Sequence, residues 1–142
     1  KAVAAKDGIT AIKIRSYRML MAYGFLRKVF EIFERYKTSI DMITTSEVSI
    51  SLTIDNVKNL DHIVDELNTF SEVEIDNNMT IVCVVGDMKS ETNFSKQIFD
   101  ALEGIPVRMI SYGGSLHNVS ILINTDNKKQ TLQKLSDHLF YN

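Results

Sequence analysis

Apolar residues along this 142-residue chain follow two different periods, and each period marks an expected element. Residues 48–54 (VSISLTI) alternate apolar and hydroxyl side chains, which is typical of a half-buried strand. Residues 25–36 instead carry apolar side chains at helical spacing, which predicts an amphipathic helix. The same criteria predict strands over 9–16, 39–44, 73–75, 79–85, 107–112 and 119–123, and helices over 60–70, 94–105 and 132–139. A polar turn is expected at residues 76–78, between two of these strands.

The order of these elements repeats along the chain. Residues 40–43 (IDMI) align with 107–110 (VRMI) at an offset of 67, and residues 48–50 align with 119–121 at an offset of 71. Four extra residues are therefore expected in the second copy, within the turn at 113–117. Two copies of about 70 residues with the order βαββαβ indicate an α+β fold made of two ferredoxin-like units, with antiparallel sheets and helices on one face.

Composition narrows the classes of function. The net charge of -2 gives no basic field for nucleic acid or for an anionic membrane. No apolar run approaches the roughly 20 residues of a membrane span. One cysteine excludes an internal disulfide and suits a reducing compartment, so a cytoplasmic location is expected. The chain starts at Lys1 rather than Met, so we expect it to be a piece of a longer protein.

Motifs for catalysis are missing from the sequence. His62, His117 and His138 have no carboxylate or cysteine at ligand spacing, and Cys83 is expected to be a buried apolar residue of a strand. The pair Gly113-Gly114 lacks the Lys-Ser/Thr of a phosphate loop. We therefore expect no catalytic residue and no metal site.

The segment 39–48 (SIDMITTSEV) is the strongest candidate for binding. Asp41 and Glu47 offer negative charge to an ammonium group, and the start of the first helix near Gly24 offers backbone N–H groups to a carboxylate. Together they would hold an amino acid. Alternatively, residues 44–46 form only a polar turn. The repeat does not keep the carboxylate, because Arg108 stands where the first copy has Asp41.

The stretches 18–30 and 39–55, above all the letters TTSEVS at 44–49, resemble the tandem ACT regulatory region of aspartokinases. These enzymes phosphorylate aspartate with ATP at the head of lysine, threonine and methionine synthesis. Residues 107–118 agree with this family, and the ending 132–140 is similar to its monofunctional, lysine-sensitive class. The resemblance implies that a first, effector-binding ACT unit (7–78) is inserted into a second unit for dimerisation (1–6 and 79–142), with a turn at Asp7-Gly8.

The resemblance also implies a lysine site in which Asp41 meets the amine of the ligand. The implied site residues are Met19, Gly24, Phe25, Leu26, Ser39, Ile40, Asp41, Thr45, Ser46, Glu47 and Val48. The sequence departs from better-known relatives at Met21-Ala22-Tyr23, where those relatives are more polar, which concerns contacts from a partner subunit.

We therefore expect a non-catalytic region that binds L-lysine, forms a homodimer through its ACT units and inhibits a kinase domain on its N-terminal side. No cofactor is expected here, whereas the parent kinase would use ATP and Mg. Neither nucleic acid nor membrane is expected as a partner. Alternatives are a sensor of threonine or another amino acid, a purely structural dimerisation module, and an enzyme of the same fold such as an acylphosphatase, for which the sequence lacks an arginine-bearing phosphate loop.

Overall fold

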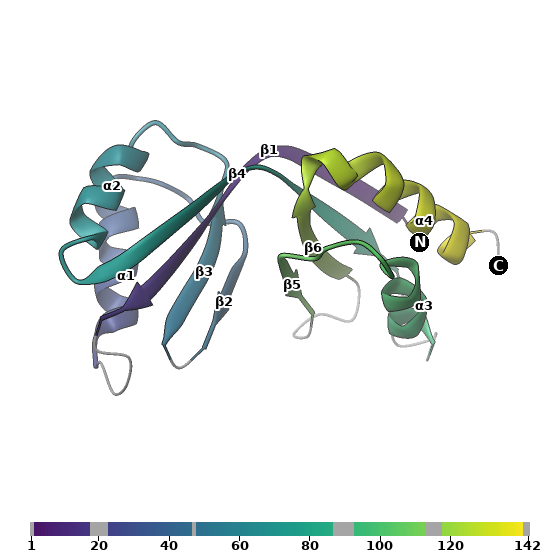
Figure 1. The fold of residues 1–142 in the computed structure, drawn as a ribbon, viewed down its shortest axis with the longest axis horizontal. Coiled ribbons are helices and arrows are strands. Elements are labelled where there is room, and N and C mark those ends of the chain that lie inside the picture. The colour runs from purple at the N-terminus through teal and green to yellow at the C-terminus, as the bar shows by residue number, and fades with distance from the viewer. Residues whose placement is uncertain (1, 18–22, 47, 87–92, 113–117, 141–142) are drawn as a thin grey trace. The chain divides into compact units, whose positions relative to one another are not determined.

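The computed structural model describes residues 2–17, 23–46, 48–86, 93–112 and 118–140. The chain divides into two compact units. We call Ile9–Asn77 the inner unit, and Lys1–Gly8 together with Asn78–Asn142 the outer unit. The outer unit is thus built from both ends of the chain, as the colours in Figure 1 show.

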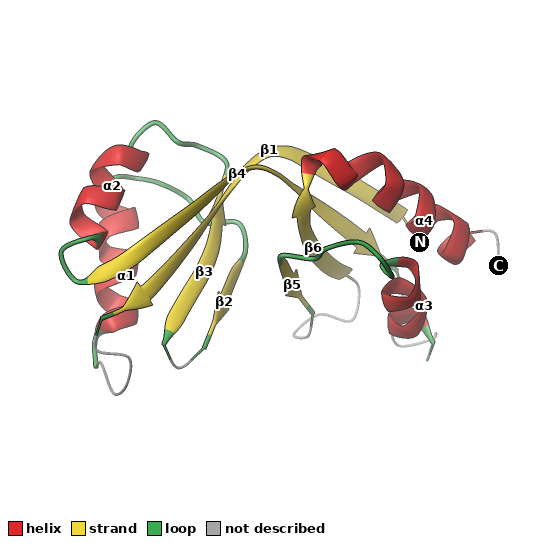
Figure 2. Ribbon diagram, in the orientation of Figure 1, coloured by secondary structure: helices red, strands yellow, loops and turns green. Residues whose placement is uncertain are grey.

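The inner unit is a four-stranded sheet with two helices on one face (Figure 2). Its strands follow the order β2-β3-β1-β4, and β1 pairs with β3 in antiparallel register from Thr10 opposite Ile54 to Arg15 opposite Ser49. Apolar side chains of β1 and β3 pack against one face of each helix. The elements are β1 (Ala2–Ser16, of which residues 9–16 lie here), α1 (Phe25–Arg35), β2 (Ile43–Thr45), β3 (Ser49–Ile54), α2 (Leu60–Leu67) and the first half of β4 (Ser71–Val85).

The outer unit repeats this plan with different segments. Its strand order is β5-β6-β4-β1, so the first residues of β1 occupy the place that β4 has in the inner unit. Its further elements are α3 (Phe94–Ala101), β5 (Met109–Ser111), β6 (Asn118–Asn124), the short helix η1 (Thr125–Asn127) and α4 (Lys128–Phe140). The expected α+β fold of two ferredoxin-like units is confirmed.

Two expected turns are absent, because β1 and β4 are continuous strands. Residues 7–8 lie inside β1, and residues 76–78 lie inside β4. Gly8 and Asn78 have positive φ, 72° and 61°. Glycine adopts this conformation without a Cβ clash, and asparagine tolerates it better than most residues. Turn-forming residues at these positions therefore mark a local twist within a strand, not a reversal of the chain.

The strand pairing corrects the alignment of the two copies. Thr10 and Thr80 are equivalent, 70 residues apart, and they pair with Ile54 and Ile123, which are 69 residues apart. The edge strands β2 and β5 keep the expected offset of 67. Between its second and third strands, the second copy is thus two residues longer than the first, because the offset rises from 67 to 69. The match of letters at an offset of 71 predicted four extra residues. An error of two residues preserves which face each side chain takes, so the alternation did not reveal it.

A threonine hydroxyl makes the same contact in both units. In the inner unit, Thr10 donates to the side-chain oxygen of Asn77 at 3.1 Å. In the outer unit, Thr80 donates to Asp7 at 2.9 Å, and Lys128 donates to the same carboxylate at 2.8 Å. The hydrogen bonds from Lys128 and Thr80 lower the pKa of Asp7 below its ordinary value of 3.8. A charged group therefore attaches the first strand to the last helix of the outer unit.

We expect Asp7→Asn, which copies the residue found at position 77, to lower the melting temperature at neutral pH. Because the folded pKa of Asp7 is depressed, its contribution is complete above pH 3.8 and is lost as the pH falls through the lower, folded pKa. The difference from wild type should therefore vanish in strong acid and shrink in high salt. Thermal unfolding followed across this pH range tests it, with Asp65→Asn as a control. A difference that does not change with pH would contradict the prediction.

Candidate functional site

The start of α1 presents backbone N–H groups without a capping side chain. Gly24 precedes the helix in a left-handed conformation (φ 81°, ψ 2°), and its carbonyl accepts a hydrogen bond from the N–H of Lys28 at 2.9 Å. Glycine has no side-chain oxygen to accept from the first turn, and no acidic residue lies in that turn. Phe25 is half-buried and Leu26 is exposed. This end of the helix can therefore accept an external carboxylate.

The turn between β2 and β3 lies at the same end of the inner unit. The N–H of Ser16, the last residue of β1, donates to the carbonyl of Val48 at 3.0 Å. This bond holds the turn at the end of the unit where β1 ends, and α1 begins at that same end (Figure 1). Two hydrogen bonds join Ser46 to Ser49 across the turn. The N–H of Ser46 donates to the carbonyl of Ser49 at 2.9 Å, and the hydroxyl oxygens of the two serines are 3.0 Å apart. Thr45 lies exposed on β2 just before it.

The other group of expected site residues lies at the opposite end. The N–H of Asp41 donates to the carbonyl of Thr53 at 2.9 Å, next to the point where Ile54 pairs with Thr10. Thr45 comes four positions after Asp41, which corresponds to about 13 Å of extended chain at roughly 3.3 Å per residue. Ser39 and Asp41 are exposed, and residue 40 packs against the core. One inner unit therefore does not bring Asp41 to the start of α1. The expected site residues Met19 and Glu47 lie outside the described residues.

The inner unit exposes apolar side chains on its edge strand β2 and on α1. Ile43 lies on the edge strand β2 opposite Leu52, so its side chain takes the helix-covered face of the sheet, yet it is 40% exposed. Leu26 and Phe30, one turn apart on α1, are 46% and 39% exposed. We call Leu26, Phe30 and Ile43 the edge strip. Edge strands with apolar neighbours are templates for pairing with another chain.

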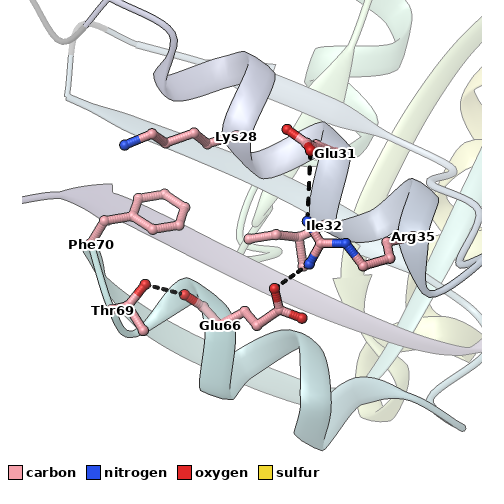
Figure 3. Close-up of a pocket in the computed structure, with 7 residues that line it drawn as sticks. All are labelled: Lys28, Glu31, Ile32, Arg35, Glu66, Thr69 and Phe70. Carbon is pink, nitrogen blue, oxygen red and sulfur yellow. Dashed lines mark hydrogen bonds and ion pairs between the residues drawn. The ribbon is translucent and has the colours of Figure 1, made fainter.

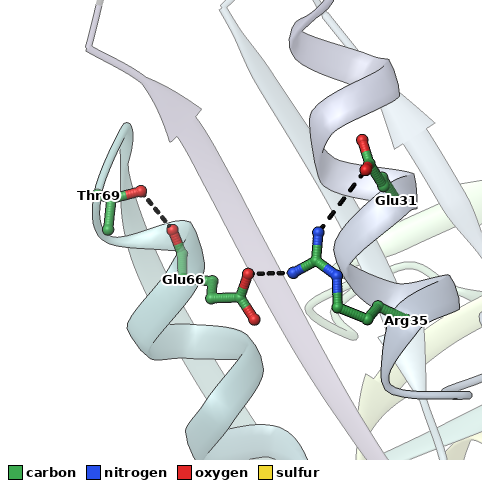
Figure 4. A network of polar contacts seen from close by, with 4 residues as sticks. All are labelled: Glu31, Arg35, Glu66 and Thr69. Carbon is green, nitrogen blue, oxygen red and sulfur yellow. Dashed lines mark hydrogen bonds and ion pairs between the residues drawn. The ribbon is translucent and has the colours of Figure 1, made fainter.

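A groove of about 270 Å³ runs between α1 and α2 on the outer face of the helices (Figure 3). Its wall holds a chain of charges, in which Arg35 forms ion pairs with Glu66 and, at 3.7 Å, with Glu31 (Figure 4). The hydrogen bond to Glu66 raises the pKa of Arg35, and hydrogen bonds from Tyr36 and Arg35 lower the pKa of Glu66. Sequence patterns missed this network because it joins two helices. The seven lining residues are Lys28, Glu31, Ile32, Arg35, Glu66, Thr69 and Phe70.

The histidines and the cysteine show no catalytic arrangement in the described part of the chain. His62 stacks on Tyr36 with ring centroids 5.7 Å apart, and His138 contacts the carbonyl of Lys134 at 2.9 Å. Cys83 is half-buried rather than buried, since it takes the face of β4 opposite to its core neighbours Val82 and Val84. Among the described residues, no cluster of His, Cys, Asp and Glu could hold a metal ion, and no helix is long and apolar enough to cross a membrane. His117 lies outside these residues.

Comparison with known proteins points to one family. The family model described as "ACT domain" matches residues 3–60 and 82–139. The chain is 34% identical to lysine-sensitive aspartokinase 3 of Escherichia coli over 99% of its own length and 33% of that protein. It spans about a third or less of the length of the curated relatives it matches.

Solved structures agree with this similarity. A putative C-terminal regulatory domain of aspartate kinase from Porphyromonas gingivalis has a TM-score of 0.89 and 52% identity, covering 98% of this chain and 96% of that one. E. coli aspartokinase III in complex with lysine and aspartate has a TM-score of 0.85 and 35% identity, covering 99% of this chain and 33% of that one.

We expect Gly24→Ala to destabilise the inner unit by about 1 kcal/mol, because a Cβ is disfavoured at positive φ. Apart from its chain neighbours, no atom of the described residues lies within 4 Å of the added methyl group, so the expected cost comes from the backbone conformation. Gly24→Asn should cost less, since asparagine adopts this conformation more readily. Urea unfolding of the two variants checks the order. Equal stability of wild type and Gly24→Ala would contradict it.

Proposed function

The chain belongs to the ACT domain family, and on that premise we propose that it is the non-catalytic regulatory region of a cytoplasmic aspartate kinase and binds L-lysine as a feedback inhibitor. The parent kinase, with its ATP and Mg, would lie on the N-terminal side. The neighbour solved with lysine supports this choice of effector. We further propose that the inner unit binds the effector and that the binding form is a homodimer.

The observation that carries the proposal is the separation of the site residues into two groups. Gly24, Phe25 and Leu26 lie with Thr45, Ser46 and Val48 at one end of the inner unit, and Ser39, Ile40 and Asp41 lie at the other. A site that uses both groups therefore needs two copies of the chain.

A two-fold axis at the edge strand would bring the two groups together. The outer edge of β2 is the end of the strand order β2-β3-β1-β4. If two copies pair antiparallel through this edge with Thr44 at the axis, residue 42 of one chain lies opposite residue 46 of the other, so residue 41 lies just past Ser46 of the partner. The carboxylate of Asp41 then lies beside the partner's β2–β3 turn and the start of the partner's α1. The edge strip supports such pairing, because its apolar side chains would be buried between the copies.

The chemistry of this composite site suits a basic amino acid. The N–H groups at the start of α1 would donate hydrogen bonds to the ligand carboxylate, and Asp41 would accept hydrogen bonds from an ammonium group. Micromolar to millimolar affinity corresponds to about 4–8 kcal/mol of binding free energy. Since ligand bound between two chains favours the paired arrangement, part of this energy, about 1–3 kcal/mol in typical couplings, would bias the kinase.

Threonine is the second candidate effector, and a purely structural module is the third. Threonine carries only one ammonium group, so its affinity would depend less on a carboxylate at the far end of the ligand. A structural module would form the dimer without responding to any amino acid. Both alternatives are decided by the same binding measurements.

We expect isothermal titration calorimetry of the purified chain to show lysine binding, and Asp41→Asn to weaken it by about tenfold or more. Loss of a charged hydrogen bond costs about 1.5–3 kcal/mol, which corresponds to this factor. Asp65→Asn, an exposed acidic residue of α2, serves as the matched control and should bind as wild type does. Tight binding of threonine instead of lysine would favour the second candidate, and no binding of either would refute the proposal.

We expect Ile43→Lys to weaken both the dimer and lysine binding. The side chain is 40% exposed at the sheet edge, so a charge there should leave the folded chain intact while opposing pairing with a second copy. Sedimentation velocity with and without lysine measures the dimer. Val57→Lys, which changes an exposed apolar residue away from β2, is the control. A monomer that binds lysine with wild-type affinity would show that one chain suffices.

A further inference from the structure

We propose that Phe70 is a positioning residue for the start of α1 and, through it, for the effector; this inference rests on the proposed function. Phe70 lies in the short turn between α2 and β4, where its N–H donates to the carbonyl of Leu67 at 3.2 Å. The next residue, Ser71, is buried and donates its hydroxyl to the same carbonyl at 2.6 Å. Phe70 is therefore held on a hydrogen-bonded turn rather than on a loose loop.

The ring of Phe70 contacts the first turn of α1 at two points. The ring of Phe25, the first residue of the helix, meets it edge-on, with centroids 5.9 Å apart and an angle of 82°. The ammonium of Lys28 lies 5.4 Å from the centroid of the same ring, as Figure 3 shows from the groove side. Edge-on aromatic pairs and a cation near a ring are both attractive arrangements. One side chain from the end of α2 thus holds the first turn of α1.

Within the residues that the structure describes, the start of α1 lacks its ordinary supports, so we expect it to depend on this contact. Gly24 provides no capping oxygen, and no acidic residue lies in the first turn to complement the helix dipole. A lysine near a helix N-terminus is itself disfavoured by that dipole. Within the described residues, no ion pair includes Lys28, and the ring of Phe70 lies beside its exposed ammonium.

Phe70 would therefore control effector affinity without touching the effector. The N–H groups that would donate to the ligand carboxylate belong to the helical turn that includes Phe25 and Lys28. A binding group must be held within about 0.5 Å of its productive position by residues behind it. Loss of the ring frees the first turn, so ordering it becomes part of the binding step and affinity falls.

The test compares Phe70→Leu, which removes the ring, with Phe70→Tyr, which keeps it. In lysine titrations of the full chain, Phe70→Leu should weaken binding by about three- to tenfold, and Phe70→Tyr should stay within about twofold of wild type. Phe99→Leu is the matched control, since it removes an exposed aromatic ring from α3 of the outer unit. Amide hydrogen exchange of residues 25–28 gives a readout without ligand, and it should be faster in Phe70→Leu and unchanged in Phe70→Tyr.

The outcomes separate this inference from the proposed function. If wild type binds no lysine, the proposed function fails, and the exchange of residues 25–28 still decides whether Phe70 holds the helix start. If wild type binds lysine and folded Phe70→Leu binds it equally well, with unchanged exchange, the inference is overturned. Should Phe70→Leu not fold, Lys28→Gln removes only the cation–ring contact from an exposed position. Unchanged exchange and affinity in that variant would overturn the inference as well.

Discussion

Both sheets depend on the pairing of β1 with β4, because each of these strands gives one half of its length to each unit. The outer unit in particular cannot complete its sheet from residues 78–142 alone, since its fourth strand comes from the first residues of the chain. The two strands serve both sheets without a chain reversal, because Gly8 and Asn78 take positive φ within them. The ion pair between Asp7 and Lys128, which are 121 residues apart in the sequence, then attaches the start of β1 to α4 within the outer unit.

Much of the fold could be predicted from the sequence, because strand and helix periods are local properties of the chain. The errors arose where one local signal fits two structures. Asp7-Gly8 and residues 76–78 have the composition of turns, yet they serve as positive-φ positions inside strands. The repeat of residues 48–50 in 119–121 is a real similarity of letters, but pairing shows it to be two residues out of register. A sheet tolerates this ambiguity since its side-chain period is also two.

The arrangement of the candidate site was harder to predict from the sequence than the fold. Two residues close in sequence can lie at opposite ends of a strand, and the sequence pattern does not show this. Residues 39–48 form one continuous segment, but β2 carries Asp41 and Ser46 to opposite ends of the inner unit. Contacts that cross elements leave no periodic signal at all. Phe70 continues the apolar stripe of α2 in the sequence and therefore suggested one more core residue of that helix. In the structure it lies beyond the helix, against Phe25 of α1.

The two units carry opposite charges at one equivalent position of the backbone. The N–H of Asp41 donates to Thr53 at 2.9 Å, and the N–H of Arg108 donates to Leu122 at 2.8 Å. These two hydrogen bonds are equivalent in the corrected register. The carboxylate of Asp41 and the guanidinium of Arg108 are therefore attached to equivalent backbone positions of the two units. Opposite charges on a shared scaffold cannot favour the same ligand group, since each attracts what the other repels. On the proposed function, an ammonium group would therefore select the inner unit, and the charge of this one side chain before the edge strand would decide which copy senses the effector.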